Sequence, residues 1–180
     1  MSSFRNLFSV FDVPVESFIV QAEKFRLDEV KAPKHEFMFP YYWRSVFRNK
    51  TLGCIFGEPS IRTRWSFESA MQKMGGNVVS SFGPQSTSAE KGESLEDMLK
   101  TASQFVDAIV VRTPEPLIEM DEILINLDGI DAHIINAGDG KNEHPTQAML
   151  DAYTIWRNFQ RLNSLRFVVV GDVSCSRTIH

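Results

Sequence analysis

The chain has 180 residues, of which 43% are hydrophobic and 23% are charged, and its formal net charge is −4. This length suits one full domain with a short remainder, and the composition predicts a packed core rather than disorder. The mildly acidic balance excludes the broad basic face of a general nucleic-acid binder, although an anion can still bind where arginines and lysines gather. The chain contains no apolar stretch long enough to cross a membrane and opens without a secretion signal, so we expect a soluble, cytoplasmic protein.

The two cysteines, Cys54 and Cys175, are far apart in the sequence, and neither belongs to a CxxC pair. A zinc site built from this chain alone requires a closer set of ligands. A disulfide framework is also not expected, which suits a reducing compartment.

Two helical segments are predicted before residue 50. Apolar residues at helical spacing run from Val15 to Phe25, and Asp12 is the predicted N-cap of that helix. Residues 31–50 contain a cluster of aromatic residues, which suggests a packed loop with a short helix near Trp43–Phe47.

From residue 51 onward, predicted strands and helices alternate. The predicted strands are 51–56, 77–82, 108–112, 133–137 and 166–171, and the predicted helices are 60–74, 94–105, 116–127 and 145–160. This alternation predicts an α/β fold, with a parallel sheet that has helices on both faces. Ligands of such folds bind at the carboxyl ends of the strands, where residues 58–64, Arg112 and residues 138–147 are expected.

The segment 60–64, Ser-Ile-Arg-Thr-Arg, follows a strand and opens a helix. Backbone N–H groups at a helix start attract anions, the hydroxyls of Ser60 and Thr63 can donate hydrogen bonds, and Arg62 can hold a phosphate through two parallel N–H bonds. The alternative is an ordinary capped helix with two solvated arginines. The segment is neither a P-loop nor a dinucleotide-binding fingerprint.

The longer string FGEPSIRTRWSFESAMQKMGG resembles the carbamoyl-phosphate signature of the transcarbamoylase family, in which S-T-R-T-R precedes S-F-E. The fold implied is therefore the carbamoyl-phosphate-binding domain of that family. Ile61 stands where the family usually has threonine, so this position offers only its backbone N–H to the phosphate. Because a hydrogen bond to a charged group contributes about 1.5–3 kcal/mol, we expect weakened rather than abolished phosphate binding.

The polar loop from Ser86 to Ser94 resembles the flexible loop of the same family, which ends in K-G-E-[ST]. The resemblance implies that Thr87 and Lys91 reach the active site of a neighbouring subunit. It also implies a homotrimer with sites shared between subunits. Taken without the resemblance, the sequence of this loop favours a mobile surface loop with a helix cap at Ser94.

Two further segments carry the resemblance. Arg112 ends the apolar strand AIVV, in a segment similar to the family's R-H-P, and Thr113 replaces the usual histidine. His144-Pro145-Thr146-Gln147 matches the family's H-P-x-Q motif at the opening of a helix, and its threonine leans toward the aspartate enzymes of the family. The alternatives are a solvated arginine at the end of a strand and a histidine that caps a helix.

The mechanism that the resemblance implies is carbamoyl transfer from carbamoyl phosphate to an amine, L-aspartate in the first instance, without metal or cofactor. Thr63, Arg112 and His144 would stabilise the developing oxyanion, Arg62 would neutralise the departing phosphate, and Gln147 would orient the carbamoyl amide. Ser60, Ile61, Thr87, Lys91 and Arg177 would bind substrate. In the family, the arginine matching Arg177 also pairs with the glutamate matching Glu58.

Residues 161–180 resemble the start of the family's amino-acid-binding domain. The expected division is therefore a carbamoyl-phosphate domain at 1–143, an interdomain helix at 144–160, and the start of a second domain, most of which is missing, at 161–180. We therefore expect a truncated chain that binds carbamoyl phosphate better than it catalyses transfer. We also expect it to associate through exposed apolar surface. Two alternatives remain open: a transcarbamoylase for another amine, or a non-catalytic homologue retained as a subunit or regulatory partner. In either case a regulatory or multienzyme partner of the chain stays open.

Overall fold

The computed structural model describes residues 7, 9, 12–31, 42–82, 93–114, 117, 130–171 and 178. Its strands are β1 (Thr51–Phe56), β2 (Asn77–Phe82), β3 (Ala108–Thr113) and β4 (His133–Asp139). Its helices are α1 (Val15–Lys31), the 3₁₀ turn η2 (Trp43–Ser45), α2 (Ile61–Lys73), α3 (Leu95–Ser103) and α5 (Pro145–Phe159).

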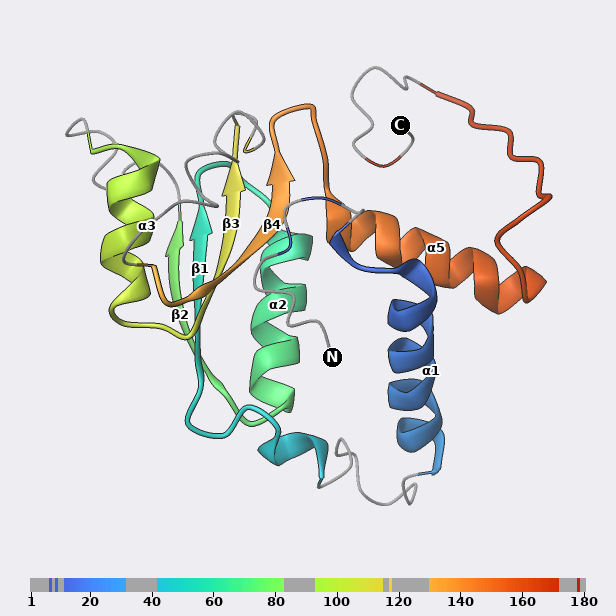
Figure 1. Cartoon of the computed structure of the whole chain (residues 1–180), viewed down its shortest axis with the longest axis horizontal. Helices are drawn as coiled ribbons and strands as arrows, with labels where there is room; N and C mark the ends of the chain where they lie inside the picture. The colour runs from blue at the N-terminus through green and yellow to red at the C-terminus, as the bar shows by residue number, and fades with distance from the viewer. Residues whose placement is uncertain are drawn as a thin grey trace.

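The four strands form one parallel sheet in the order β2-β1-β3-β4. The centre of the sheet is apolar: Cys54 of β1 lies between Ser80 of β2 and Val110 of β3. Beyond β4, Leu7 forms an isolated parallel bridge with Ile135. Since the strands run in one direction, all their carboxyl ends lie at the same edge of the sheet (Figure 1).

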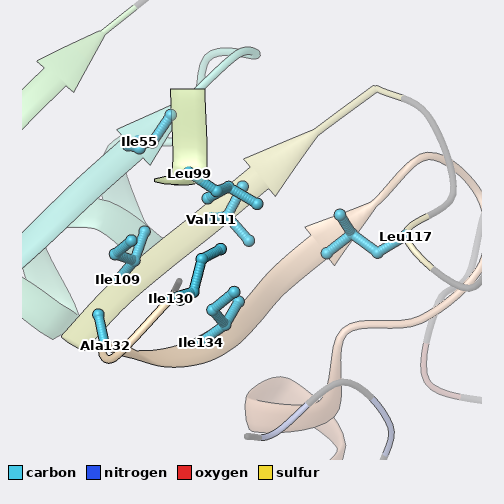
Figure 2. Close-up of a cluster of buried hydrophobic side chains, with 8 residues drawn as sticks. All are labelled: Ile55, Leu99, Ile109, Val111, Leu117, Ile130, Ala132 and Ile134. Atoms are coloured by element: carbon cyan, nitrogen blue, oxygen red, sulfur yellow. The ribbon is translucent and has the colours of Figure 1, made fainter. Parts of the chain in front are cut away.

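Two hydrophobic clusters cover the two faces of this sheet. On one face, Leu99 of α3 packs among side chains from β1, β3 and β4, and Figure 2 shows this cluster, which consists of Ile55, Leu99, Ile109, Val111, Leu117, Ile130, Ala132 and Ile134. On the other face, Met71 of α2 packs with Leu52, Cys54, Phe56, Val110 and Ala137. The α/β fold with helices on both faces of a parallel sheet is therefore confirmed.

The end of α2 depends on a glycine. Gly75 has a φ of +85°, and a Cβ atom built there would lie 1.7 Å from the carbonyl oxygen of Arg44. Only glycine allows this close approach between the turn after α2 and η2. The predicted helix end at Gly75-Gly76 follows from this contact.

Three sequence predictions need correction or lie outside the described residues. Residues 166–170 form no strand: they are exposed, and no described strand lies beside them to pair with their backbone. Asp12 is not the N-cap of α1, because its carboxylate accepts a hydrogen bond from the backbone N of Ser9 at 2.8 Å and the helix begins at Val15. The predicted helix 116–127 lies almost wholly outside the described residues.

Candidate functional site

A cleft of about 530 Å³ lies at the carboxyl edge of the sheet. Three separate parts of the fold supply most of its wall: the start of α2 after β1, the end of β3, and the start of α5 after β4. Its lining residues are Ser60, Arg62, Thr63, Ser66, Arg112, His144, Thr146, Gln147, Leu150 and Thr178. Six of the residues that the sequence singled out are therefore brought into one cleft.

A second cleft, of about 580 Å³, lies between α2 and the opposite ends of the strands. Leu52, Phe67, Met71 and Ile135 give it a mainly apolar wall. Anion chemistry therefore favours the first cleft, where Arg62 and Arg112 supply permanent positive charge.

The start of α2 presents its polar groups to the first cleft. Ser60 holds the N-cap position, but its side chain makes no capping hydrogen bond. Arg64 lies within 3.4 Å of Glu68 and does not line the cleft, whereas Arg62 and Thr63 do. Ile61 is 59% exposed and is also absent from the cleft wall.

Arg112 is held in place from two sides. Its Nη2 lies 2.6 Å from Oε1 of Glu58, and its Nη1 donates to the carbonyl oxygen of Ala137 at 3.0 Å. The arginine side chain is 13% exposed and the glutamate side chain 24%. These two contacts hold the Arg112 guanidinium at the carboxyl edge of the sheet in the ligand-free chain.

His144 is 9% exposed and holds the N-cap position of α5, where its side chain makes no capping hydrogen bond, and Pro145 follows at the first helical position. Its Nε2 lies 3.4 Å from Oγ1 of Thr63, and its Nδ1 lies 3.4 Å from Oγ1 of Thr146. One turn further along the helix, Nε2 of Gln147 donates to Oδ1 of Asp151 at 2.9 Å. This bond uses one of the two N–H groups of the Gln147 amide and leaves its carbonyl oxygen available as an acceptor for a ligand.

Sequence reasoning missed Asp139, which organises both loops behind the cleft. This carboxylate is fully buried, and it accepts hydrogen bonds from the backbone N of Leu117 at 2.7 Å, Nδ2 of Asn142 at 3.0 Å and the backbone N of Glu143 at 2.8 Å. It therefore ties the loop after β3 to the loop that leads to His144. In the sequence, an acidic residue between two glycines just after an apolar run is the pattern that could have indicated this role.

Thr87, Lys91 and Arg177 lie outside the described residues. The implied pairing of Glu58 with Arg177 is therefore not described, and in this structure Glu58 pairs with Arg112. Among the described residues, no group of three or more histidine, cysteine, aspartate or glutamate side chains is placed to hold a metal ion. None of the described helices is long and apolar enough to span a bilayer.

Residues 5–157 match the family described as aspartate/ornithine carbamoyltransferase, carbamoyl-P binding domain. The chain belongs to this family. The aspartate carbamoyltransferase catalytic subunit of Methanothermobacter thermautotrophicus is 48% identical over an alignment of 144 residues, which covers 76% of this chain and 42% of the relative. That of Thermococcus onnurineus is 47% identical over 133 residues, 74% of this chain and 42% of the relative.

Solved structures of family members show the same fold. The aspartate transcarbamoylase of Trypanosoma cruzi, in complex with carbamoyl phosphate and aspartate, has a TM-score of 0.78 and 29% identity, and the match covers 97% of this chain and 54% of that one. The catalytic subunit of the M. jannaschii enzyme has a TM-score of 0.76 and 35% identity, with 97% and 54% covered. The chain thus spans about two fifths of the length of the curated relatives it matches.

Proposed function

We propose that this chain binds carbamoyl phosphate in the cleft at the carboxyl edge of its sheet and takes part in carbamoyl transfer to L-aspartate. The observation that carries the proposal is the convergence of Arg62, Thr63, Arg112, His144 and Gln147 on one cleft. These residues come from three separate parts of the chain, and they are the positions that match the family's motifs.

The phosphate would bind over the start of α2. Two features of that start support this: its backbone N–H groups and helix dipole favour an anion, and Arg62 can form two parallel bonds to phosphate oxygens. Ser60 would add a hydroxyl, since its side chain makes no capping bond. The side chain of Ile61 has no hydrogen-bonding group and does not line the cleft, so at this position only the backbone N–H would bond the phosphate.

In the transfer step, the uncharged amine nitrogen attacks the carbamoyl carbon, a C–N bond forms, the C–O bond to phosphate breaks, and the proton that the nitrogen loses passes to the departing phosphate. Negative charge develops on the carbamoyl oxygen, which Arg112, His144 and Thr63 would stabilise as hydrogen-bond donors. Gln147 would accept a bond from the carbamoyl NH₂ through its amide oxygen, because its NH₂ group already bonds Asp151. Holding both reactants in line would supply much of the remaining rate.

The wider proposal keeps the division into residues 1–143, 144–160 and 161–180, with Thr87, Lys91 and Arg177 as further substrate-binding residues. It includes a homotrimer with sites shared between subunits, and a cytoplasmic location. Its support is the family membership and the names of the relatives. A sedimentation measurement that finds one chain per particle at all concentrations would remove the trimer from the proposal.

The first test is calorimetric titration of the chain with phosphonoacetamide, a stable analogue of carbamoyl phosphate. We expect Arg62→Ala to weaken binding by about 10- to 150-fold, because it removes charge-assisted hydrogen bonds of about 1.5–3 kcal/mol. Arg157→Ala on the exposed side of α5 is the matched control and should bind as the unaltered chain does. Equal affinity in the Arg62→Ala and unaltered chains would contradict the assignment of the phosphate site.

A further inference from the structure

The imidazole of His144 has a threonine hydroxyl beside each of its nitrogens. Thr63 approaches Nε2 and Thr146 approaches Nδ1, each at 3.4 Å. A neutral imidazole has one nitrogen that donates and one that accepts, so the two hydroxyls must play opposite roles. Which nitrogen carries the proton decides what the cleft can offer to a ligand.

The ring has two neutral tautomers, which differ in the nitrogen that carries the proton. They assign opposite roles to Thr63 and Thr146, so the surroundings of the two hydroxyls distinguish them.

The position of Thr146 in its helix decides between them. Thr154, further along α5, donates its hydroxyl to the carbonyl oxygen of Leu150 at 2.8 Å. Thr146 is the second residue of the helix, so the carbonyl four residues earlier belongs to the preceding loop. Within the part of the chain that the structure describes, the hydroxyl of Thr146 has one hydrogen-bond partner, which is Nδ1 of His144.

A proton on Nδ1 would leave the O–H of Thr146 with no acceptor among the described residues. In that tautomer the Thr63 hydroxyl would donate its hydrogen bond to Nε2. Neither group would then have a donor left for a ligand in the cleft. A proton on Nε2 avoids the first loss and keeps a donor for the ligand: Thr146 donates to Nδ1, Nε2–H lies against Oγ1 of Thr63 at the cleft wall, and the O–H of Thr63 remains available for the carbamoyl oxygen.

We propose that Thr146 is a positioning residue that holds His144 in the tautomer protonated at Nε2, as a donor facing the cleft. This inference rests on the proposed function only for its purpose, which is to present a donor to the carbamoyl oxygen. The tautomer itself is a property of the ligand-free chain. It can therefore be measured without any substrate.

The test is a two-bond ¹H–¹⁵N correlation spectrum of the full chain with ¹⁵N-labelled histidine, at pH 8. The chain has four histidines, and the signals lost in His144→Gln identify the ring of interest. We expect a protonated Nε2 and an accepting Nδ1. In Thr146→Val, the Nδ1-protonated form should become populated, while Thr146→Ser should restore the original pattern and Thr154→Val, the matched control, should leave it unchanged.

A second readout links the tautomer to the site. Phosphonoacetamide affinity should fall roughly three- to tenfold in Thr146→Val, the effect of one neutral hydrogen bond, and recover in Thr146→Ser. A His144 ring protonated at Nδ1 in the unaltered chain, or a tautomer that Thr146→Val does not shift, would overturn the inference. If the tautomer behaves as expected but phosphonoacetamide does not bind the unaltered chain, the proposed function fails while the assignment to Thr146 stands.

Discussion

At the scale of single residues, the Glu58–Arg112 pair sets the charge that a ligand meets. The two side chains come from the loop after β1 and the end of β3, and their atoms are 2.6 Å apart. An incoming anion must compete with the Glu58 carboxylate for the same guanidinium. The pair therefore fixes the position of Arg112 and lowers its attraction for phosphate at the same time.

Glu58→Gln separates these two effects. The amide keeps a similar shape but removes the competing charge, so we expect phosphonoacetamide to bind several-fold more tightly at low salt. The gain should shrink as ionic strength rises, because added ions screen the interaction. Calorimetric titrations of both forms at two salt concentrations make the measurement, and weaker binding at both would show that positioning by Glu58 outweighs its charge.

Cys54 makes a second prediction at this scale. Burial raises the pKa of its thiol to about 11 from an ordinary 9.0, Glu68 acts in the same direction, and a hydrogen bond with Ser80 and the charge of Arg64 act against both. At pH 8 about 0.1% of the thiol is ionised, so alkylation by iodoacetamide should be slow in the folded chain and fast in urea. In a Cys175→Ser variant, Cys54 is the one remaining cysteine, so the measured alkylation is that of Cys54.

The sign of the accompanying pH effect follows from the raised pKa. The folded state holds the thiol proton more tightly than the unfolded state, so this contribution to stability is complete below pH 9 and is lost as pH rises toward 11. Urea unfolding of the unaltered chain and of Cys54→Ala, at pH 8 and pH 10.5, measures this contribution to the free energy of unfolding.

The alkylation experiment has its own contradicting outcome. Alkylation at the rate of an exposed thiol at pH 8 would contradict the burial of Cys54.

At the scale of elements, Asp139 joins the ends of β3 and β4. One of its oxygens accepts from Leu117 and Asn142, and the other accepts from Glu143. Arg112 precedes the first of these loops and His144 ends the second. The relative placement of the two candidate donors thus depends on one buried carboxylate that touches neither.

Asp139→Asn places an NH₂ group against at least one of these donors. We expect the free energy of unfolding to fall by about 1–3 kcal/mol, the cost of leaving a buried polar group without its partner. Urea titration followed by circular dichroism checks this. Glu29→Gln, at an exposed position on α1, is the control and should change stability by less than about 0.5 kcal/mol.

The elements were largely predictable from sequence, while the contacts between them were not. The strands 51–56 and 77–82 were predicted correctly because apolar runs between polar turns carry a local signal. Residues 166–171 carry the same signal, but a strand also needs a neighbour to bond with its backbone, which no local pattern can supply. The Glu58–Arg112 pair and the three bonds of Asp139 join residues far apart in the sequence, so only the folded chain reveals them.

At the scale of the whole molecule, residues 167–170 form an apolar segment outside the core. Phe167 is 56% exposed, and Val168 and Val170 are 88% and 91% exposed. A contiguous apolar surface of this kind favours association between molecules. This agrees with the sequence expectation that the chain exposes apolar surface.

Val168→Lys should reduce concentration-dependent association without changing the folded state, because it breaks the apolar surface and adds charge. Sedimentation velocity over a range of protein concentrations gives the measurement. Asn163→Lys adds the same charge on the same exposed segment without removing apolar surface, and it should reduce association less. If the two variants reduce association equally, the reduction comes from the added charge and not from the loss of apolar surface.

The order of the strands in the sheet has a consequence for how the chain is made. Thr51 of β1 pairs with Asn77 of β2, whereas Leu52 of the same strand pairs with Ala108 of β3, much later in the chain. Closing the shorter connection costs less chain entropy, and its residues leave the ribosome first. The β1–α2–β2 unit with its anion-attracting helix start can therefore assemble during synthesis before Arg112 and His144 have left the ribosome. The part of the cleft proposed to bind phosphate would then form before the part that holds Arg112 and His144.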